Sequence, residues 1–501
     1  MSIRSVFNKV FKSKDEFDLT GGGIGWPLFY LSLPIIITNL FQTAYNLADT
    51  FWLGQYSTTA LAAISFAFPI VFLLISLALG LSVAGSVLVA QHIGAGEERK
   101  AEYAASQTIT YAVVASLVLG GAGYFLVEDF LALLGAAPDI AAQATGYMQV
   151  FSAGLVAVFG FAVFISLMRG YGDTITPMLV MFGSVVLNIV LDPLLIFGFE
   201  SNPLFGYLGM RGLETWLFEL TGYAGSGIEG AAIATVFSRV LAFVVGLWIM
   251  FRGTRGVQIR LSQMTPNLSF ARRVFDIGVP ASIEGTTRSL SINLLMFIIA
   301  AFPETVVAAY GIGTRVFSVI FLPALALSQG IETMTGQNIG AKKQDRAAET
   351  NHFGSRIMLI GLTAFGVIVW LAAAPVAAVF TNDPAVVDAT ATFLRYAAPT
   401  FGFIGVMRAY TGGLRGAGKT LIAAVISLIA LGIVRLPVAW IGTNVLALDA
   451  TGLWIAFPVS NIAGGVIAYL WFKRGTWREA DLTDSEFGSD VPSTEHASTD
   501  D

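Results

Sequence analysis

The sequence contains no cysteine and few charged residues. Its 501 residues include 28 Lys and Arg, 33 Asp and Glu and three His, and charged side chains make up 12% of the chain, compared with about 25% in a typical soluble domain. The lack of cysteine excludes disulfide bonds, thiol nucleophiles and thiolate metal sites. The low charge content excludes an ordinary soluble enzyme.

Long apolar segments, in contrast, are abundant. Apolar residues make up 55% of the chain, and runs of about 20 residues, the length that crosses a hydrocarbon core of about 30 Å, recur along nearly all of it. Continuous apolar runs predict α-helices, because a backbone in lipid must satisfy its own polar groups. We therefore expect an all-α membrane protein with twelve transmembrane helices, at residues 27–53, 60–90, 104–127, 142–167, 177–198, 229–251, 272–301, 306–336, 354–380, 388–412, 420–442 and 452–472.

Lysine and arginine residues in the loops predict the orientation. They gather at the amino terminus, after the even-numbered helices and after the last helix, whereas the loops after odd-numbered helices hold only Arg211. Because cytoplasmic loops carry the excess of cations, we expect a multi-pass cell-membrane protein with both termini cytoplasmic. The expected regions are a cytoplasmic segment (1–26), an amino-terminal lobe (27–251), a cytoplasmic linker (252–271), a carboxy-terminal lobe (272–473) and an acidic, disordered cytoplasmic tail (474–501).

The two halves of the chain are internal repeats. Residues 34–174 align without a gap with residues 280–420, at a constant offset of 246, and the offset later falls to 222, which leaves 24 extra residues in segment 200–227 of the first half. Each half holds six helices, so the halves share one orientation and are related by a pseudo-two-fold axis along the membrane normal. Two such lobes around a cavity favour alternating-access transport. The alternative is gene duplication in a channel or scaffold.

Polar side chains follow one face of the first predicted helix. Thr38, Gln42, Tyr45 and Asp49 are spaced by four, three and four residues, which places them on a single stripe. A bare carboxylate within a span costs about 2.5–3.5 kcal/mol on insertion scales, so Asp49 must be paired, solvated or neutralised. The stripe is expected to face the interior of the lobe.

A second pair of polar residues, Asn188 and Asp192, lies in the fifth predicted helix. Together with Asp49 and Thr235 these oxygen-bearing side chains would suit Na⁺, whereas two neighbouring carboxylates could instead share a proton. The residues alone leave both ions open. The repeat places Leu295 and Val438 opposite the two acids, so the common fold does not require either carboxylate.

These segments resemble the multidrug and toxic compound extrusion (MATE) transporters over residues 25–475. The resemblance is carried by Pro34 to Asp49, by Gln91 to Gly96, by Arg169 to Asp173 and by Leu187 to Leu194. The aspartates of the first half look like the archaeal and DNA-damage-inducible branch. Another branch also uses carboxylates in the seventh and tenth helices, of which this chain has only Glu284, in the seventh.

The resemblance implies a secondary-active antiporter that exports amphipathic, cationic small molecules in exchange for H⁺ or Na⁺. It implies no enzyme activity and no cofactor besides the coupling ion. The expected partners are small-molecule substrates and membrane lipids, with no nucleic acid, and the expected state is a monomer. The implied residues are an ion site (Asp49, Asn188, Asp192, Thr235), a substrate-binding stripe (Thr38, Asn39, Gln42, Tyr45), a hinge at Pro34 and a possible second site at Glu284.

Several alternatives remain open at this point. A lipid-linked oligosaccharide or lipid flippase of the same superfamily is the nearest rival function. Glu284 could simply pair with Arg288 one helical turn away, and Asp192 could cap a helix bend at Pro193. Residues 413–420 match the phosphate-binding pattern G-x-x-x-x-G-K-[ST], but that pattern acts between a strand and a helix, and here it follows an apolar span.

Overall fold

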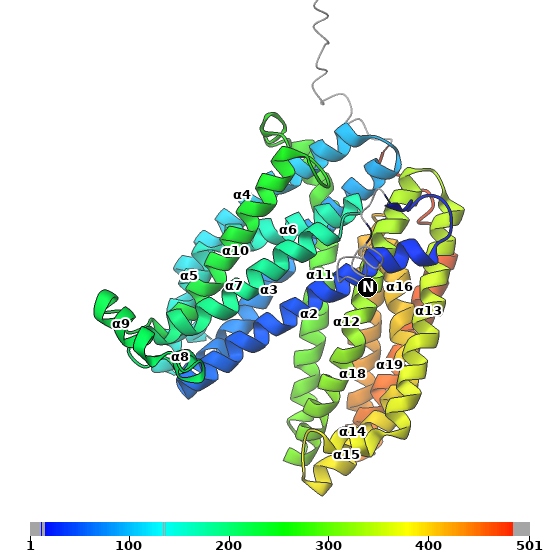
Figure 1. Ribbon diagram of the computed structural model, residues 1–501. Coiled ribbons are helices and arrows are strands. Elements are labelled where there is room, and N and C mark those ends of the chain that lie inside the picture. Colours follow the sequence, from blue (N-terminus) through cyan, green and yellow to red (C-terminus); the bar gives the residue numbers. More distant parts are fainter. Residues whose placement is uncertain (1–11, 13–15, 134, 136, 484–501) are drawn as a thin grey trace, which may run out of the picture.

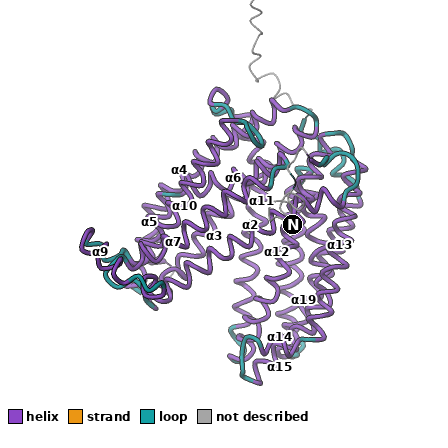
Figure 2. Tube along the Cα trace, in the orientation of Figure 1, coloured by secondary structure: helices purple, strands orange, loops and turns teal. Residues whose placement is uncertain are grey.

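The computed structural model describes residues 12, 16–133, 135 and 137–483. Within that part of the chain every regular element is a helix, joined by short loops (Figure 2). The prediction of an all-α protein is confirmed.

The first six spans form the N-lobe. Its fourth span is a pair of helices bent by 55° at Gly154, where a Cβ atom would collide with the side chain of Val236. Close packing against the neighbouring helix therefore requires glycine at the bend. The helices are α2 (Gly25–Tyr56), α3 (Thr58–Gly94), α4 (Glu98–Leu133), α5 (Pro138–Ala153), α6 (Leu155–Tyr171), α7 (Ile175–Phe197) and α10 (Gly227–Arg252).

The last six spans form the C-lobe. The eleventh span of the chain contains two π-helical turns, η4 and η5. Such turns are rare in proteins, and those that occur often lie at functional sites. The elements are α11 (Leu268–Ile299), α12 (Glu304–Gly340), α13 (Gln344–Leu371), α14 (Ala373–Ala378), α15 (Pro384–Ala397), η3 (Ala398–Thr400), α16 (Phe401–Gly416), α17 (Thr420–Ser427), η4 (Leu428–Val434), α18 (Arg435–Trp440), η5 (Ile441–Val445) and α19 (Asp449–Lys473).

All twelve predicted spans coincide with helical segments. Within the described residues, nine helices are long and apolar enough to cross a membrane, and the bent pair α5–α6 makes a tenth. The other two predicted spans are α11, which carries Glu284 and Arg288 within its length, and the broken helix α15–α16. Charge in the first case and a break in the second explain why these two segments are less apolar or shorter than the rest.

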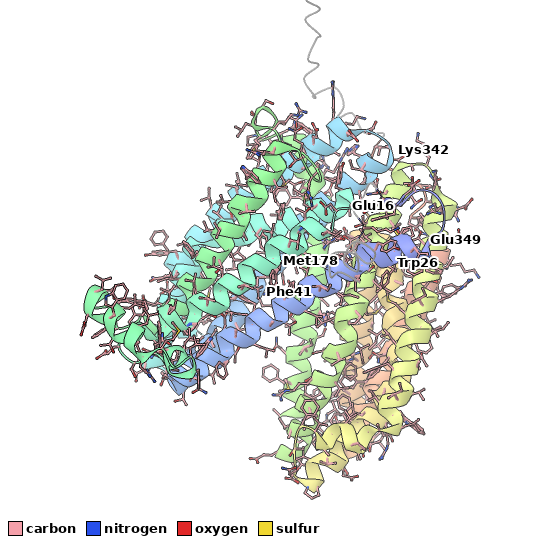
Figure 3. All side chains as sticks on the ribbon, viewed as in Figure 1. Glu16, Trp26, Phe41, Met178, Lys342 and Glu349 are labelled. Carbon is pink, nitrogen blue, oxygen red and sulfur yellow. The ribbon has the colours of Figure 1, made fainter. Side chains whose placement is uncertain are left out.

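The two lobes form a V (Figure 1). We call the end where they touch the closed end and the end where they diverge the open end. The charged residues Glu16, Lys342 and Glu349 lie near the closed end, whereas Phe41 and Met178 lie together on the N-lobe between the two ends (Figure 3). Charged tips and an apolar middle are what a membrane-spanning bundle requires.

Reciprocal hydrogen bonds join the lobes at the closed end. The Gln91 side chain donates to the carbonyl oxygen of Gly416 (3.0 Å), and the Gln337 side chain donates to that of Gly170 (3.0 Å). Each pair of equivalent residues is 246 positions apart, so the two bonds are related by the internal repeat. We call these four residues the clasp.

The extra residues of the first half fold at the open end. They form α8 (Pro203–Tyr207) and α9 (Arg211–Thr221) beside the end of α7. Asn202 is fully buried there, and its side-chain amide donates to the carbonyl oxygens of Pro193 (2.7 Å) and Gly198 (2.8 Å). The insertion therefore supplies buried donors to two carbonyl groups at the end of α7.

Segments outside the spans pack on the closed end. The linker between the lobes contains the short helix η2 (Leu261–Gln263), and Gln107 of α4 donates to the carbonyl oxygen of Gln263 (2.6 Å). At the start of the predicted tail, Trp477 is buried, and the Leu482 amide donates to the Gln91 side chain (2.9 Å). Residues 474–483 are thus packed against the protein, and the remainder of the predicted disordered tail lies outside the described residues.

Candidate functional site

Two carboxyl groups of the N-lobe lie close together inside the bundle. Asp49 of α2 and Asp192 of α7 are both buried, and Asn188, one turn before Asp192, is fully buried. The side chain of Asp49 lies within interaction range of Asp192, Asn188 and Tyr45. Packing of α2 against α7 thus unites residues that are more than 130 positions apart in the chain.

Three oxygen atoms of this group have no hydrogen-bond partner among the described residues. Asn188 donates its Nδ2 to Asp192 Oδ1 (3.0 Å), but Asp49 Oδ1, Asp192 Oδ2 and Asn188 Oδ1 are buried without a partner. An unsatisfied buried polar group costs about 1–3 kcal/mol, and more if it is charged. A bound proton or a Na⁺ ion would supply what these oxygens lack.

Asp192 does not act as a backbone cap for the bend at Pro193. Its Oδ1 atom accepts from a side chain, and its Oδ2 atom has no partner. The carbonyl oxygen of Pro193 accepts a hydrogen bond from Asn202 of the insertion.

Thr235 of α10 is linked to the two carboxyl groups by way of Tyr45, which lies within interaction range of Asp49. The Tyr45 hydroxyl donates to Thr235 Oγ1 at 2.5 Å, and both residues are buried. Tyr147 of α5 is also buried, and it lines the same cavity as Tyr45 and Thr235. The residues predicted as the ion site, Asp49, Asn188, Asp192 and Thr235, are therefore brought together by α2, α7 and α10.

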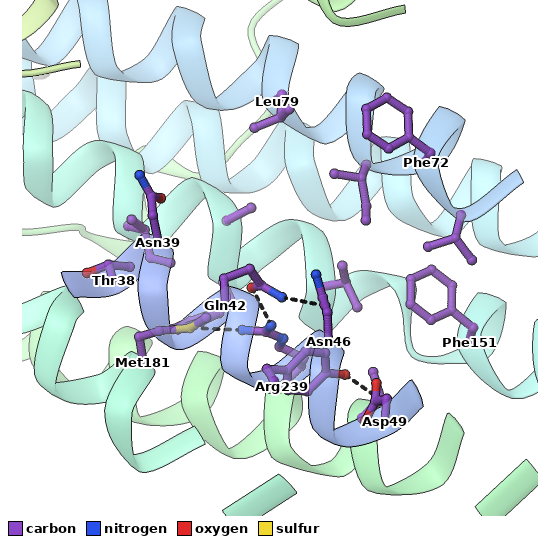
Figure 4. Close-up of a pocket in the computed structure, with 18 of the residues that line it drawn as sticks. Thr38, Asn39, Gln42, Asn46, Asp49, Phe72, Leu79, Phe151, Met181 and Arg239 are labelled. Atoms are coloured by element: carbon purple, nitrogen blue, oxygen red, sulfur yellow. Dashed lines mark hydrogen bonds between the residues drawn. The ribbon is translucent and has the colours of Figure 1, made fainter. Parts of the chain in front are cut away.

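An arginine that was not among the predicted site residues lies beside them. Arg239 of α10 donates to Gln42 Oε1 (2.7 Å) and to the sulfur of Met181 (3.2 Å), and its guanidinium lies 4.9 Å from the centre of the Tyr45 ring. Figure 4 shows it between Gln42 and Met181. A single arginine inside the apolar sixth span was the signal in the sequence, since such residues mark functional sites.

A cavity of about 590 Å³ opens beside this group (Figure 4). The predicted stripe, Thr38, Asn39, Gln42, Tyr45 and Asp49, lines it on one side, and aromatic, aliphatic and polar side chains line the rest. Its walls come from the N-lobe helices, and only Gln329 comes from the C-lobe. The sequence predicted a cavity between the lobes; this one is built within the N-lobe. Its aromatic members are Tyr45, Phe68, Phe72, Tyr147, Phe151 and Phe161.

Helix α2 continues through Pro34, the predicted hinge. The helix is unbroken from Gly25 to Tyr56, and the Thr38 hydroxyl donates to the carbonyl oxygen of Pro34 (2.9 Å). Proline at this position removes one backbone hydrogen bond, which leaves the helix weaker there than elsewhere. A bending motion at Pro34 stays a prediction.

Glu284 does not pair with Arg288, as the local alternative supposed. It instead binds Arg415 of α16 (3.0 Å), which also binds Glu332 of α12 (2.9 Å). Arg169 of the N-lobe approaches Glu332 to 4.0 Å. Arg169 and Arg415, counted from the sequence as loop cations, are buried in the last turns of α6 and α16 and form a charge network near the closed end.

The comparisons with known proteins agree with the fold and the repeat. The MatE family model matches residues 34–194 and again residues 280–441, and the two matches begin 246 positions apart, the offset found within the sequence. Together they span well over half of the chain.

Similar proteins carry transport names. The chain is 28% identical to a FAD transporter of Shewanella oneidensis, over 92% of this chain and 97% of that protein. It is 27% identical to a probable multidrug resistance protein NorM of Thermotoga maritima, over 90% and 93%. It is 24% identical to the multidrug export protein MepA of Staphylococcus saprophyticus, over 91% and 96%.

Solved structures share the fold. A MATE structure in the bent conformation superposes with a TM-score of 0.82 at 23% identity, covering 94% of this chain and 100% of that one. An outward-facing multidrug resistance MATE transporter gives a TM-score of 0.80 over 93% and 98%. The duplicated family match, the two-lobe fold and these relatives agree: the chain belongs to the MATE family of membrane transporters and is not an enzyme.

Proposed function

We propose that this protein exports amphipathic, cationic small molecules from the cell in exchange for H⁺ or Na⁺ that enters through Asp49 and Asp192. The protein lies in the cell membrane as a monomer, with both termini and the closed end on the cytoplasmic side and the α8–α9 insertion outside. In this orientation the V opens outward.

The observation that carries the proposal is the set of unpartnered oxygens of Asp49, Asn188 and Asp192 directly behind the cavity. Asp49 belongs to both places, because it lines the cavity and also faces Asp192. A cationic substrate in the cavity is attracted by the ionised carboxylates. When H⁺ or Na⁺ binds them, that attraction is lost and the substrate leaves. Such competition is the basis of exchange.

The test is efflux from proteoliposomes loaded with a fluorescent lipophilic cation. A proton gradient and a sodium gradient are imposed separately, and the gradient that drives efflux identifies the ion. Asp49→Asn and Asp192→Asn should each abolish gradient-driven efflux, because the neutral amide removes the charge that alternates between ion and substrate. The matched control is Asp129→Asn, at an exposed position near the end of α4, which should pump like the parent. Parent rates in either site variant would refute the ion site.

A second candidate is export of an anionic aromatic molecule such as FAD, the substrate named for the Shewanella relative. It is favoured by two arginines of the C-lobe, Arg288 and Arg435, that form no ion pair with a described carboxylate. The same liposomes separate the candidates, since FAD and the cationic dye can be loaded in parallel. A lipid flippase, the remaining rival, would move a fluorescent lipid between leaflets and leave both soluble probes inside.

A further inference from the structure

Two arginines of the C-lobe, Arg288 and Arg408, lie against one phenylalanine, and a third, Arg435, lies against another. The guanidinium of Arg288 lies 3.4 Å from the centre of the Phe321 ring, and that of Arg408 lies 4.7 Å from it. The guanidinium of Arg435 lies 4.7 Å from the centre of the Phe457 ring, and the charges of Arg408, Glu284 and Arg435 all act on Arg288. We call Arg288, Arg408 and Arg435 the arginine cluster.

Within the described part of the chain, the three cations of the cluster share one nearby acid. The nearest acid, Glu284, is held by Arg415 at 3.0 Å and reaches Arg408 only at 3.9 Å. Arg408 is buried, and its Nε atom has no hydrogen-bond partner.

The other two arginines form no ion pair with a described carboxylate; the charge of Glu284 also acts on Arg288. Arg288 makes no hydrogen bond or ion pair to any described residue, and Arg435 donates only to the neutral side chains of Ser460 (2.8 Å) and Asn461 (3.0 Å). Arginine stays protonated in proteins. Uncompensated cations inside a membrane protein are costly and mark substrate or ion pathways.

The internal repeat relates residues of the cluster to residues that line the N-lobe cavity. At the offset of 246, Arg288 corresponds to Gln42 and Arg408 to Ala162, while Phe321 corresponds to Ile75. All three N-lobe residues line the cavity of the N-lobe. The C-lobe thus carries cationic side chains at positions whose N-lobe counterparts face a binding space.

We propose that the arginine cluster is an anion-binding subsite that holds a phosphate, sulfonate or carboxylate group of the transported molecule. The planar guanidinium fork matches such oxyanions in a bidentate manner, and the unpartnered Arg408 Nε provides a donor for one oxygen. This subsite rests on the proposed export function in one respect, because its ligand is taken to be the transported molecule. It implies that the two lobes bind groups of opposite charge.

The experiment is a binding titration with 1-naphthyl phosphate on the full-length protein in phosphatidylcholine nanodiscs. The parent should bind it, and 1-naphthylmethylamine, a cation of similar shape, should not compete. Arg288→Gln and Arg408→Gln should each weaken binding by tenfold or more. Arg315→Gln, an exposed arginine on α12, is the matched control and should bind like the parent. Equal affinity in parent and cluster variants would overturn the proposal.

A folding control and a lipid control accompany this titration. Removing an uncompensated cation should not prevent folding, and thermal unfolding of each variant checks this. A lipid headgroup is the other source of an oxyanion. If the variants lose only co-purifying phosphatidylglycerol, and the parent in phosphatidylcholine does not bind naphthyl phosphate, the cluster is a lipid site and the proposal fails.

The ion site and the subsite can be distinguished. Asp49→Asn should stop gradient-driven efflux of the cationic dye yet bind naphthyl phosphate like the parent. Arg408→Gln should lose binding of naphthyl phosphate. Loss of both properties in both variants would mean that the two lobes do not have separate binding roles, which would contradict the proposed subsite.

Discussion

Asp49 and Asp192 show how a residue's neighbours decide its role. Each carboxyl group has one buried oxygen without a partner, and the two side chains lie within interaction range of each other. Two neighbouring carboxylates inside a bundle cannot both remain ionised at low cost. They should therefore take up and release ions as a unit.

That coupling predicts the behaviour of the double variant. Asp49→Asn with Asp192→Asn should be no worse in efflux than either single variant, because the effects of groups that act together are not additive. A double-mutant cycle of initial efflux rates measures this. Losses that multiply would show two independent sites instead.

Arg239 allows a prediction about substrate charge. It lies in the wall of the cavity beside Gln42, where its charge opposes binding of a cation. Arg239→Gln should therefore lower the KM for a monovalent cationic dye several-fold. A neutral dye of similar size is the control and should show little change. A raised KM for the cation alone would contradict this account of the cavity.

At the scale of helices, the sequence predicted where the membrane spans lie but not where they bend or change to a π-helical turn. Span length and apolarity predicted all twelve segments, because lipid forces each span to satisfy its own backbone. The bend at Gly154 depends on how a neighbouring helix packs against it. Such contacts have no signature in a single segment.

The same limit applies to the candidate site. Helical spacing and the internal repeat were enough to single out Asp49 and Asp192. The link from Tyr45 to Thr235 and the position of Arg239 depend on how α10 packs against α2, and spacing within one helix does not contain that information. Arg415 was counted as a loop residue for a related reason: it lies at a helix end, and only the partners from α11 and α12 reveal that it is buried.

The segment that resembles a phosphate-binding loop is a helix end in the structure. Residues up to Gly416 belong to α16, Gly418 forms a left-handed turn (φ 72°), and the Thr420 hydroxyl donates to the carbonyl oxygen of Ile277 (2.8 Å). Lys419→Ala should therefore leave ion-driven efflux within about twofold of the parent. Loss of transport, together with ATP hydrolysis by the parent, would contradict secondary-active transport.

The insertion should stabilise the end of α7 through Asn202. Asn202→Ala removes donors to two carbonyl groups in a buried place, and each unsatisfied group costs about 1–3 kcal/mol. We expect a lower unfolding temperature and faster amide exchange at Gly198 to Leu208. Asn444→Ala, at an exposed position, is the matched control. Unchanged exchange would show that the insertion does not stabilise α7.

At the scale of the molecule, the clasp holds one end of the V together. A Cβ atom on Gly340 would collide with the carbonyl oxygen of Gln91, and one on Gly94 with that of Gln337. Gly340→Val should therefore separate the lobes at the closed end. Because the chain has no cysteine, a cysteine added beside the clasp can report the opening as faster thiol labelling. Gly361→Val, where nothing lies near, is the control, and equal labelling would contradict the role of the clasp.

The orientation of the whole molecule is testable in the same cysteine-free background. Thr221→Cys, in the exposed end of α9, should react with an impermeant thiol reagent in intact cells, and Glu349→Cys, exposed near the closed end, should not. The excess of cationic loops at the closed end is the reason for this expectation. The opposite labelling pattern would reverse the topology.

Because the paired acids occur in only one lobe, the number of coupling ions in each cycle is limited. That number in turn limits the substrate concentration ratio that the transporter can maintain across the membrane. Two carboxyl groups carry at most two protons in each cycle. If two protons enter for each monovalent cation that leaves, one net charge moves inward, and a membrane potential of 100 mV contributes about 2.3 kcal/mol, or roughly a fiftyfold concentration ratio. Each unit of pH difference multiplies that ratio by about a hundred. Exchange for one Na⁺ would be electroneutral, and the substrate ratio could then not exceed that of Na⁺. The steady-state ratio at a known potential therefore reports how many charges the Asp49 and Asp192 pair carries.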